Sequence, residues 1–247
     1  MMGRNTAGKG TLTVEKKQRI ELIDALRGFA VLLMLMHHFI YDLVVFAGAP
    51  RWLFQNVFFH MLHYVSAGLF VVLSGVSSQF SGSNVKRGVK VLLCAAVITV
   101  VTVFMDMDIW FGVLHLLGVC MVLYGLSRPV WEKIPSWLVL TMSVAGLLAT
   151  WHMEYGILTD KPYLWMFGFV TDTFYSSDYF PLLPWGFVFL FGIWLGRYVK
   201  AGKLPQWFYT VRAPRLAAVG RQSLKIYMLH QTVVYVVAVG LGFLLKL

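Results

Sequence analysis

IDALRGFAVLLMLMHHFIYDL, residues 23–43, combines the apolar side chains of a membrane-spanning helix with five ionisable groups. The five are Asp24, Arg27, His37, His38 and Asp42. About 20 mainly apolar residues suffice to cross the hydrocarbon core of a bilayer as a helix. A charged side chain at its centre costs at least ~2.5–3.5 kcal/mol. The stretch therefore predicts a spanning helix whose polar side chains face protein or water.

The rest of the chain repeats this apolar character. Of its 247 residues 59% are hydrophobic and 13% charged, and the mean hydropathy is +0.72. We therefore expect a single integral membrane domain over residues 1–247, all-α and polytopic, rather than a soluble fold. Seven transmembrane helices are predicted, at residues 23–47, 58–80, 89–105, 109–127, 136–153, 180–199 and 222–245.

Charge placement predicts the orientation of these spans. The formal charge is +10, but the cations lie in short loops beside apolar spans, which argues against a nucleic-acid partner. With the N-terminus cytoplasmic, only Arg51, Lys161 and Lys246 fall outside, while Arg27 lies within a span. We therefore expect a basic cytoplasmic tail at residues 1–20 and an extracytoplasmic C-terminus.

The longest predicted external segment covers residues 154–179. It contains YLWMFGFV, residues 163–170, which is apolar but too short to cross a bilayer. We interpret residues 163–170 as an interfacial or re-entrant piece, because an eighth span would place the basic 197–225 region outside. Loops as long as 154–179 are often functional.

Four of the five ionisable groups in the first span share one face of the helix. At about 100° per residue, with Asp24 at zero, Arg27 lies near −60°, His38 near −40° and Asp42 near 0°. His37 lies near −140° and is interpreted as a polar neighbour. The line of four must face protein or water.

Spacing along this face suggests two pairs. Asp24 can pair with Arg27 one turn away, and Asp42 can orient the imidazole of His38 at i, i+4. Arg27 lies about 16 Å from His38 along the axis, which suggests an anion clamp near the cytoplasm and a base deeper in the membrane. A structural alternative remains: Asp24 and Arg27 form a helix-end pair, with Arg27 reaching the headgroups.

These residues resemble those of a known family. Arg27 and His38 are separated by ten residues, similar to a pattern in the first helix of transmembrane acyltransferases. More narrowly, the chain resembles the bacterial branch of the heparan-alpha-glucosaminide N-acetyltransferase catalytic-domain family. The resemblance rests on the first span and on LFVVLSGVSSQFS (69–81), FGVLHLLGV (111–119), SSDYFPLLPWGFVFLFGIWLGR (176–197) and GRQSLKIYMLHQ (220–231), in order.

The resemblance implies an enzyme of the bacterial cytoplasmic (inner) membrane. It implies transfer of an acyl group, usually acetyl, from cytoplasmic acyl-coenzyme A to an extracytoplasmic glycan or amine. By position, His38 is the implied base and Arg27 the implied contact of the coenzyme phosphates, with Asp24 beside it. Animal members carry their proposed catalytic His in the loop after the first span. The corresponding region here has His60 and His63 at its end without a clear motif match, so His60, His63 and His115 stay open as alternatives to His38.

Further candidates are distributed over later spans. Ser223, Tyr227 and His230 share a helical face near the predicted cytoplasmic start of the last span, and are candidates for coenzyme binding or for a polar packing seam. Asp178 and Trp185, at the outer mouth, are candidates for acceptor binding, as are His63 and His115. A helix-entry turn with an aromatic anchor is the alternative for Trp185. For His115 a helix-to-helix hydrogen bond is equally consistent.

The sequence also bears on two other cofactor classes and on one other function. No metal is expected, because His60 and His63 have no Cys or carboxylate at ligand spacing. Seven His residues would allow a haem, but no His pair lies clearly opposite another at matching depth. The alternative function is a proton-coupled transporter lined by the Asp24, Arg27, His38 and Asp42 face. Apolar helix faces would also permit a homodimer.

Overall fold

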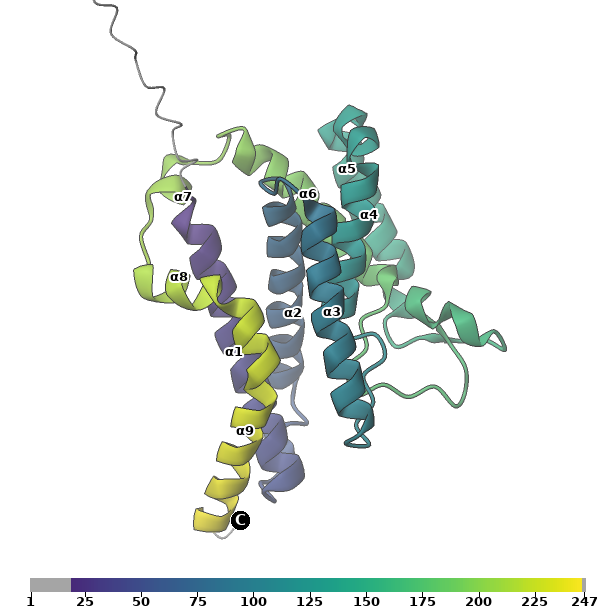
Figure 1. Ribbon diagram of the computed structural model, residues 1–247, viewed down its shortest axis with the longest axis vertical. Helices are drawn as coiled ribbons and strands as arrows, with labels where there is room; N and C mark the ends of the chain where they lie inside the picture. Colours follow the sequence, from purple (N-terminus) through teal and green to yellow (C-terminus); the bar gives the residue numbers. More distant parts are fainter. Residues whose placement is uncertain (1–18, 246–247) are drawn as a thin grey trace, which may run out of the picture.

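The protein is a bundle of long helices, shown in Figure 1, in a computed structural model that describes residues 19–245. The helices are α1 (Glu21–Phe46), α2 (Val57–Ser78), α3 (Asn84–Val103), α4 (Val113–Lys133), α5 (Ser136–Thr150), α6 (Leu182–Lys200), α7 (Gln206–Thr210), α8 (Pro214–Arg221) and α9 (Ser223–Leu245). Short 3-10 helices are η1 (Arg51–Leu53), η2 (Trp151–Met153) and η3 (Pro162–Phe167), and the strands are β1 (Ile157–Leu158) and β2 (Phe169–Val170).

Within residues 19–245, six segments are long and apolar enough to cross a membrane. They are α1, α2, α4, α5 with η2, α6 and α9. The third predicted span, α3, is not among them, because it carries Lys86, Arg87 and Lys90 in its first two turns. A mostly helical fold with candidate membrane-spanning helices is thus confirmed, whereas the seven-span count and the orientation stay predictions.

Two predicted boundaries were displaced by local structure. Helix α3 begins at Asn84 rather than 89, because the Ser83 side chain accepts a hydrogen bond from Lys86 N and caps the helix. Helix α4 begins at Val113 rather than 109, because residues 108–111 pair with the end of the 154–179 loop. Ser177 N donates to Asp108 O, and Phe180 N donates to Phe111 O.

Helix α1 lies between two groups of helices. It packs against α2 on one side and against α8 and α9 on another, while α2 packs against α6, α6 against α5, and α3 against α4. Small residues permit the closest of these crossings. A Cβ at Gly75 would meet the backbone of α6 at Phe189 and Gly192, and a Cβ at Gly192 would meet the backbone of α2. Membrane helices commonly associate through such backbone approaches.

The contact of α1 with α8 is equally close and sets the height at which α9 begins. A Cβ at Gly28 would meet Leu216 O, and one at Gly220 would meet Asp24 O. Helix α9 follows α8 after one residue and runs beside α1 in the same direction, toward the end where the C-terminus lies (Figure 1). Further along, Phe46 of α1 contacts Tyr235 of α9 with ring centroids 5.0 Å apart.

The 154–179 loop folds against the bundle rather than crossing it. Residues 163–170 form most of η3 and all of β2, and β2 pairs in parallel with β1. Aromatic side chains of the loop join the main hydrophobic core, in which Phe111, Phe180 and Trp185 are buried. The segment is therefore not an eighth spanning helix.

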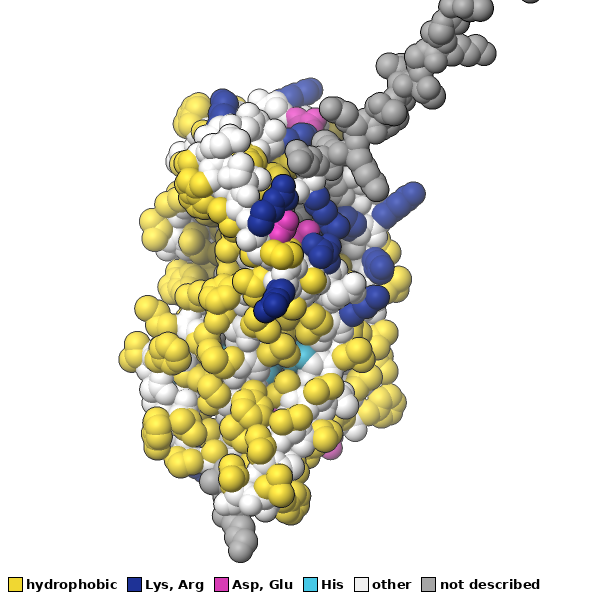
Figure 2. Space-filling view, turned by 90° about the vertical axis from the view of Figure 1, so that its left-hand side faces the viewer, with side chains coloured by type: hydrophobic (Ala, Val, Ile, Leu, Met, Phe, Trp, Pro, Cys, Tyr) yellow, Lys and Arg dark blue, Asp and Glu magenta, His cyan; other side chains and the backbone are white. Residues whose placement is uncertain are grey.

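Charge is concentrated at one end of the bundle. Figure 2 shows Lys and Arg side chains gathered in the upper half of the molecule, with hydrophobic side chains covering most of the face below. Histidine is visible within the hydrophobic region (Figure 2). A broad apolar band with cations at one end is the surface expected of a protein embedded in a bilayer.

Candidate functional site

A guanidinium is held in place near the start of α1. Arg27 Nη1 donates to Asp24 Oδ1 at 2.9 Å, and Arg27 Nη2 donates to the Ser77 hydroxyl of α2. Asp24 is only 4% exposed and is also reached by Arg19 Nε at 3.2 Å. The Asp24–Arg27 pair therefore forms, and it also anchors α1 to α2 through Ser77.

Other cations surround this inner site. Arg87 Nη1 donates to Ser77 O at 3.4 Å, so two guanidinium groups approach the same serine. Arginine has five N–H donors, of which the bonds to Asp24 and Ser77 use two on Arg27. The remaining donors and the neighbouring Arg87 make this end suitable for a phosphate or another anion.

Asp42 does not orient His38. Both Asp42 carboxylate oxygens accept hydrogen bonds from Gln231 Nε2 of α9, each at 3.1 Å, and Asp42 is fully buried. No hydrogen bond joins Asp42 to His38 within residues 19–245. The i, i+4 pairing expected from the sequence was therefore wrong, because a donor from α9 occupies the carboxylate. Asp42 instead fixes α9 against α1.

His38 faces α9 and meets His230. The two ring centroids lie 4.8 Å apart with the planes at 60°. His230 is 8% exposed, and its Nδ1 lies 2.6 Å from Tyr227 O. The sequence placed Tyr227 and His230 near the cytoplasmic end. The structure places His230 deeper, beside His38, because α8 occupies the level of Asp24 to Gly28 and α9 begins beyond it.

His37 points toward α2 rather than toward α9. Its ring stacks on Phe59 with centroids 4.3 Å apart and lies 5.0 Å from the ring of His63. With the His37–His38 centroid distance of 5.6 Å, four histidines form a row across α9, α1 and α2. We call His230, His38, His37 and His63 the histidine row. Sequence reasoning found its members separately but not their contact.

Asp178 caps the start of α4. Its Oδ2 accepts a hydrogen bond from Val113 N at 3.3 Å, at the start of α4, where a carboxylate is favoured by the helix dipole. Burial raises the pKa of Asp178 to about 6, while the backbone N–H of Val113 acts in the opposite direction. Gly112 lies directly against this carboxylate. The geometry gives Asp178 a structural role that its sequence position did not suggest.

Another buried carboxyl, that of Glu154, lies among aromatic rings. Glu154 is 8% exposed and accepts a hydrogen bond from the Tyr64 hydroxyl at 3.2 Å. Burial raises its pKa, and the bond from Tyr64 partly offsets the effect. Trp185 is 2% exposed and packs on Phe180 with centroids 4.8 Å apart. In this conformation Trp185 presents almost no surface on which a sugar could stack.

Two candidates lie apart from the histidine row. His115 sits between α3 and α4, where its Nε2 lies 3.2 Å from the Thr99 hydroxyl. This contact matches the helix-to-helix hydrogen bond that is the structural alternative for His115. Ser223 is the first residue of α9, directly after the α8 turn. Among residues 19–245, no group of three His, Cys, Asp or Glu side chains is placed to hold a metal ion.

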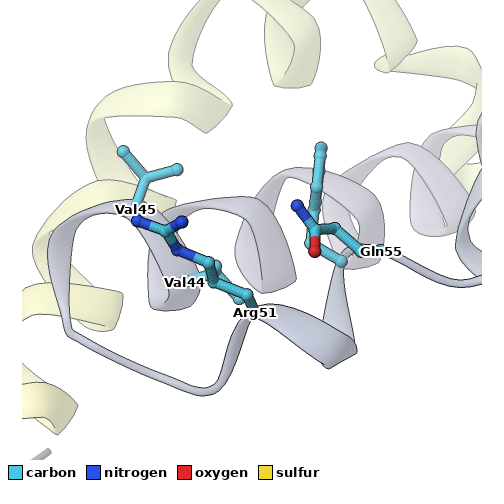
Figure 3. A pocket seen from close by; sticks show the side chains of 5 residues that line it. Val44, Val45, Arg51 and Gln55 are labelled. Carbon is cyan, nitrogen blue, oxygen red and sulfur yellow. The ribbon is translucent and has the colours of Figure 1, made fainter.

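Two pockets open beside connections between helices. One lies by the α1–α2 connection, where Arg51 and Gln55 face the valines of α1 (Figure 3). The other lies between the α3–α4 connection and the 154–179 loop. It is lined by Asp108, Trp110, Pro162, Trp165, Thr171, Thr173, Phe174 and Tyr175. Aromatic faces, hydroxyls and a carboxylate are the groups that bind sugars and amines.

Sequence reasoning missed two residues with clear partners. Gln231, which holds Asp42, stands next to His230 in the sequence, but an amide has no local pattern that reveals its partner. Glu154 was placed outside the spans, and only the fold brings it to Tyr64 of α2.

One comparison with known proteins gave a match. The family model described as heparan-alpha-glucosaminide N-acetyltransferase, catalytic, matches residues 19–232. Comparisons with curated proteins and with solved structures gave none. The matched range contains the inner Arg27 site and the whole histidine row.

Proposed function

Because the chain belongs to the heparan-alpha-glucosaminide N-acetyltransferase catalytic family, we propose that it transfers an acetyl group from cytoplasmic acetyl-coenzyme A to an amino sugar or glycan outside the membrane. The family name implies a membrane acetyltransferase. The donor, the acceptor, the side from which each enters and the residue roles are our proposal. The observation that carries it is a held guanidinium, Arg27, and a half-buried imidazole, His38, on one helix.

The inner site is proposed to bind the coenzyme phosphates. Arg27 is fixed by Asp24 and Ser77 but keeps free donor capacity, and Arg87 approaches the same serine. The gathering of Lys and Arg at this end supports the proposal that it faces the cytoplasm, where the coenzyme is found. The pantetheine arm separates the phosphates from the thioester. The binding cation and the base must therefore be separated too, as Arg27 and His38 are by about 16 Å along α1.

His38 is proposed as the general base. A neutral imidazole is the usual acceptor of a proton from an amine or hydroxyl near neutral pH. As the acceptor nitrogen or oxygen bonds to the thioester carbon, His38 takes its proton and the carbon–sulfur bond breaks. The coenzyme leaves as a thiolate, which then takes a proton from the His38 imidazolium. His63 lies at the α2 end of the same row and is proposed to contact the approaching acceptor.

The acceptor is proposed to approach from the 154–179 loop. The pocket lined by Asp108, Trp110 and Trp165 has the groups that a cationic amino sugar requires: a carboxylate for its ammonium and rings for its apolar face. Phe111 packs on Trp165 with centroids 5.6 Å apart, and Phe180 lies 5.7 Å from His63. The pocket and the histidine row therefore border one aromatic core. The enzyme is proposed to lie in a bacterial cytoplasmic membrane.

The test is thioester loss from acetyl-coenzyme A by purified protein in detergent, with glucosamine as acceptor. We expect His38→Gln to lower the rate by roughly 10²–10⁴-fold while coenzyme binding is kept. Arg27→Lys should raise the Kd for the coenzyme about tenfold or more, because lysine cannot reproduce the forked contacts to Asp24 and Ser77. Matched controls are His152→Gln and Arg51→Lys, two exposed positions.

The outcomes separate the hypotheses. Full activity in His38→Gln would move the base to another histidine and contradict the assigned role. No coenzyme binding or turnover in the wild type would refute the acyltransferase itself. Proton flux through the protein in liposomes without coenzyme would then favour the transporter.

A further inference from the structure

His230 has a fixed tautomer and an unpartnered nitrogen. Its Nδ1 lies 2.6 Å from Tyr227 O, and a backbone carbonyl only accepts, so Nδ1 carries the proton. In the neutral ring, Nε2 is then the acceptor. Nε2 is buried and has no hydrogen-bond partner within residues 19–245. Buried polar atoms are nearly always paired, so an orphan of this kind calls for a functional explanation.

The nearest titratable partner for this nitrogen is His38. Two imidazoles that share a hydrogen bond have ring centroids about 5 Å apart, given an N···N distance near 2.9 Å. The observed separation of 4.8 Å is within that reach. The rings stand at 60° and form no hydrogen bond in this conformation, so the His38 ring must rotate to make one.

The approach of the two rings is built into the helix packing. Gln231, the residue after His230, donates to both oxygens of Asp42, one turn beyond His38 on α1. At the other end, Gly220 lies against the backbone of Asp24. One contact on each side of the His38–His230 pair therefore fixes the position of α9 along α1. The His230 ring therefore lies beside His38 because the helices are fixed, and not because a flexible side chain happens to reach it.

We propose that His230 is a proton-sharing partner of His38, a positioning residue that acts through the base rather than on the substrate. The inference rests on the proposed acyltransferase function. In the resting enzyme, His230 Nε2 accepts a hydrogen bond from His38 and orients the opposite nitrogen of His38 toward the acceptor. Tyr227 O holds the tautomer, as the third member of a catalytic triad does for its histidine.

The proton balance during transfer is complete. His38 takes a proton from the acceptor N–H or O–H as the new bond to the acetyl carbon forms and the carbon–sulfur bond breaks. The imidazolium passes its second N–H proton partly or wholly to His230 Nε2, so the positive charge spreads over two rings. When the thiolate takes a proton from His38, the proton on His230 returns. No oxidant, metal or further reactant is required.

The first experiment compares His230→Gln with His152→Gln, a histidine of the exposed η2 turn. Glutamine can still donate to Tyr227 O but cannot carry a proton. We expect the single-turnover rate with acetyl-coenzyme A and glucosamine to fall more than about tenfold in His230→Gln, less than in His38→Gln. The KM for the coenzyme should be unchanged. Wild-type rate in His230→Gln would overturn the inference while leaving the proposed function intact.

The second experiment needs no variant and decides the question if His230→Gln does not fold. The wild-type single-turnover rate is measured at increasing fractions of deuterium oxide. Transfer of two protons in the same step gives a bowed dependence, whereas one proton gives a straight line. A straight line would overturn proton sharing. Absence of any wild-type turnover would refute the proposed function, and the inference with it.

Discussion

The close crossing of α1 and α8 makes a sharp prediction about Gly220. A Cβ at this position would lie far inside van der Waals contact with Asp24 O, and the obstacle is backbone, which cannot rotate away. The helices must separate to accept even one methyl group. Overpacking of this kind costs about 1–3 kcal/mol. For a chain of this length, that corresponds to a loss of roughly 2–12 °C in melting temperature.

The assay is thermal unfolding in detergent, followed by tryptophan fluorescence, for Gly220→Ala and for two controls. Gly68→Ala and Gly240→Ala place the same methyl group in helices where nothing lies within 4 Å. Alanine favours helix over glycine by roughly 1 kcal/mol, so the controls should be neutral or stabilised. Gly28→Ala meets Leu216 O in the same interface. Its effect should therefore not add fully to that of Gly220→Ala.

Activity gives a second measure of the same change. Helix α9 follows α8 after one residue, so displacing Gly220 also shifts His230 relative to His38. We expect the acetyl-transfer rate of Gly220→Ala to fall even at temperatures where the variant is folded. A melting temperature of Gly220→Ala within the range of the controls would refute the α1–α8 contact and the reasoning built on it.

Three further predictions concern polar contacts. In a double-mutant cycle, Asp42→Ala and Gln231→Ala should show a coupling of roughly 1.5–3 kcal/mol in unfolding free energy, whereas additive effects would contradict the pair. Burial raises the pKa of Asp178 from 3.8 to about 6, which favours the protonated carboxyl in the folded state. The stability that the protonated carboxyl contributes to the folded state is therefore lost as the pH rises through 6. The melting temperature of wild type relative to Asp178→Asn should therefore fall between about pH 4 and pH 6, and a constant difference would argue against the burial. Ser77→Ala should weaken coenzyme binding, measured by calorimetry, about two- to tenfold through the lost bond to Arg27, and unchanged affinity would separate Ser77 from the site.

Sequence reasoning succeeded where the physics is local. Apolar runs fix which segments are helical in a membrane, and the helical repeat places Asp24 and Arg27 within one turn, where they pair. The motifs from the first span to residue 231 indicated the family that the comparison confirmed. The helical segments and the Asp24–Arg27 pair depend on residues that are close in sequence, and the family resemblance depends on the order of motifs along the chain.

It failed where a partner comes from a distant helix. Asp42 had a plausible partner at i, i+4, but a buried carboxylate bonds whichever donor the fold brings, and that donor was Gln231 of α9. Helix α8 is short and polar, so no apolar pattern in the sequence predicted it. Its packing against Gly28 nevertheless decides how deep His230 lies. The depth error for His230 therefore follows directly from the missed helix.

His37 and His38 show why considering only one face of α1 misses part of the site. His37 and His38 are about 100° apart on the helix, so they cannot serve the same neighbour. His38 meets α9 and His37 meets α2, and the histidine row therefore crosses α1 instead of following it. A stripe along one helix describes how a coenzyme arm would run from Arg27 to the base. The transverse row describes where the base finds its partners, and only the packing of three helices creates it.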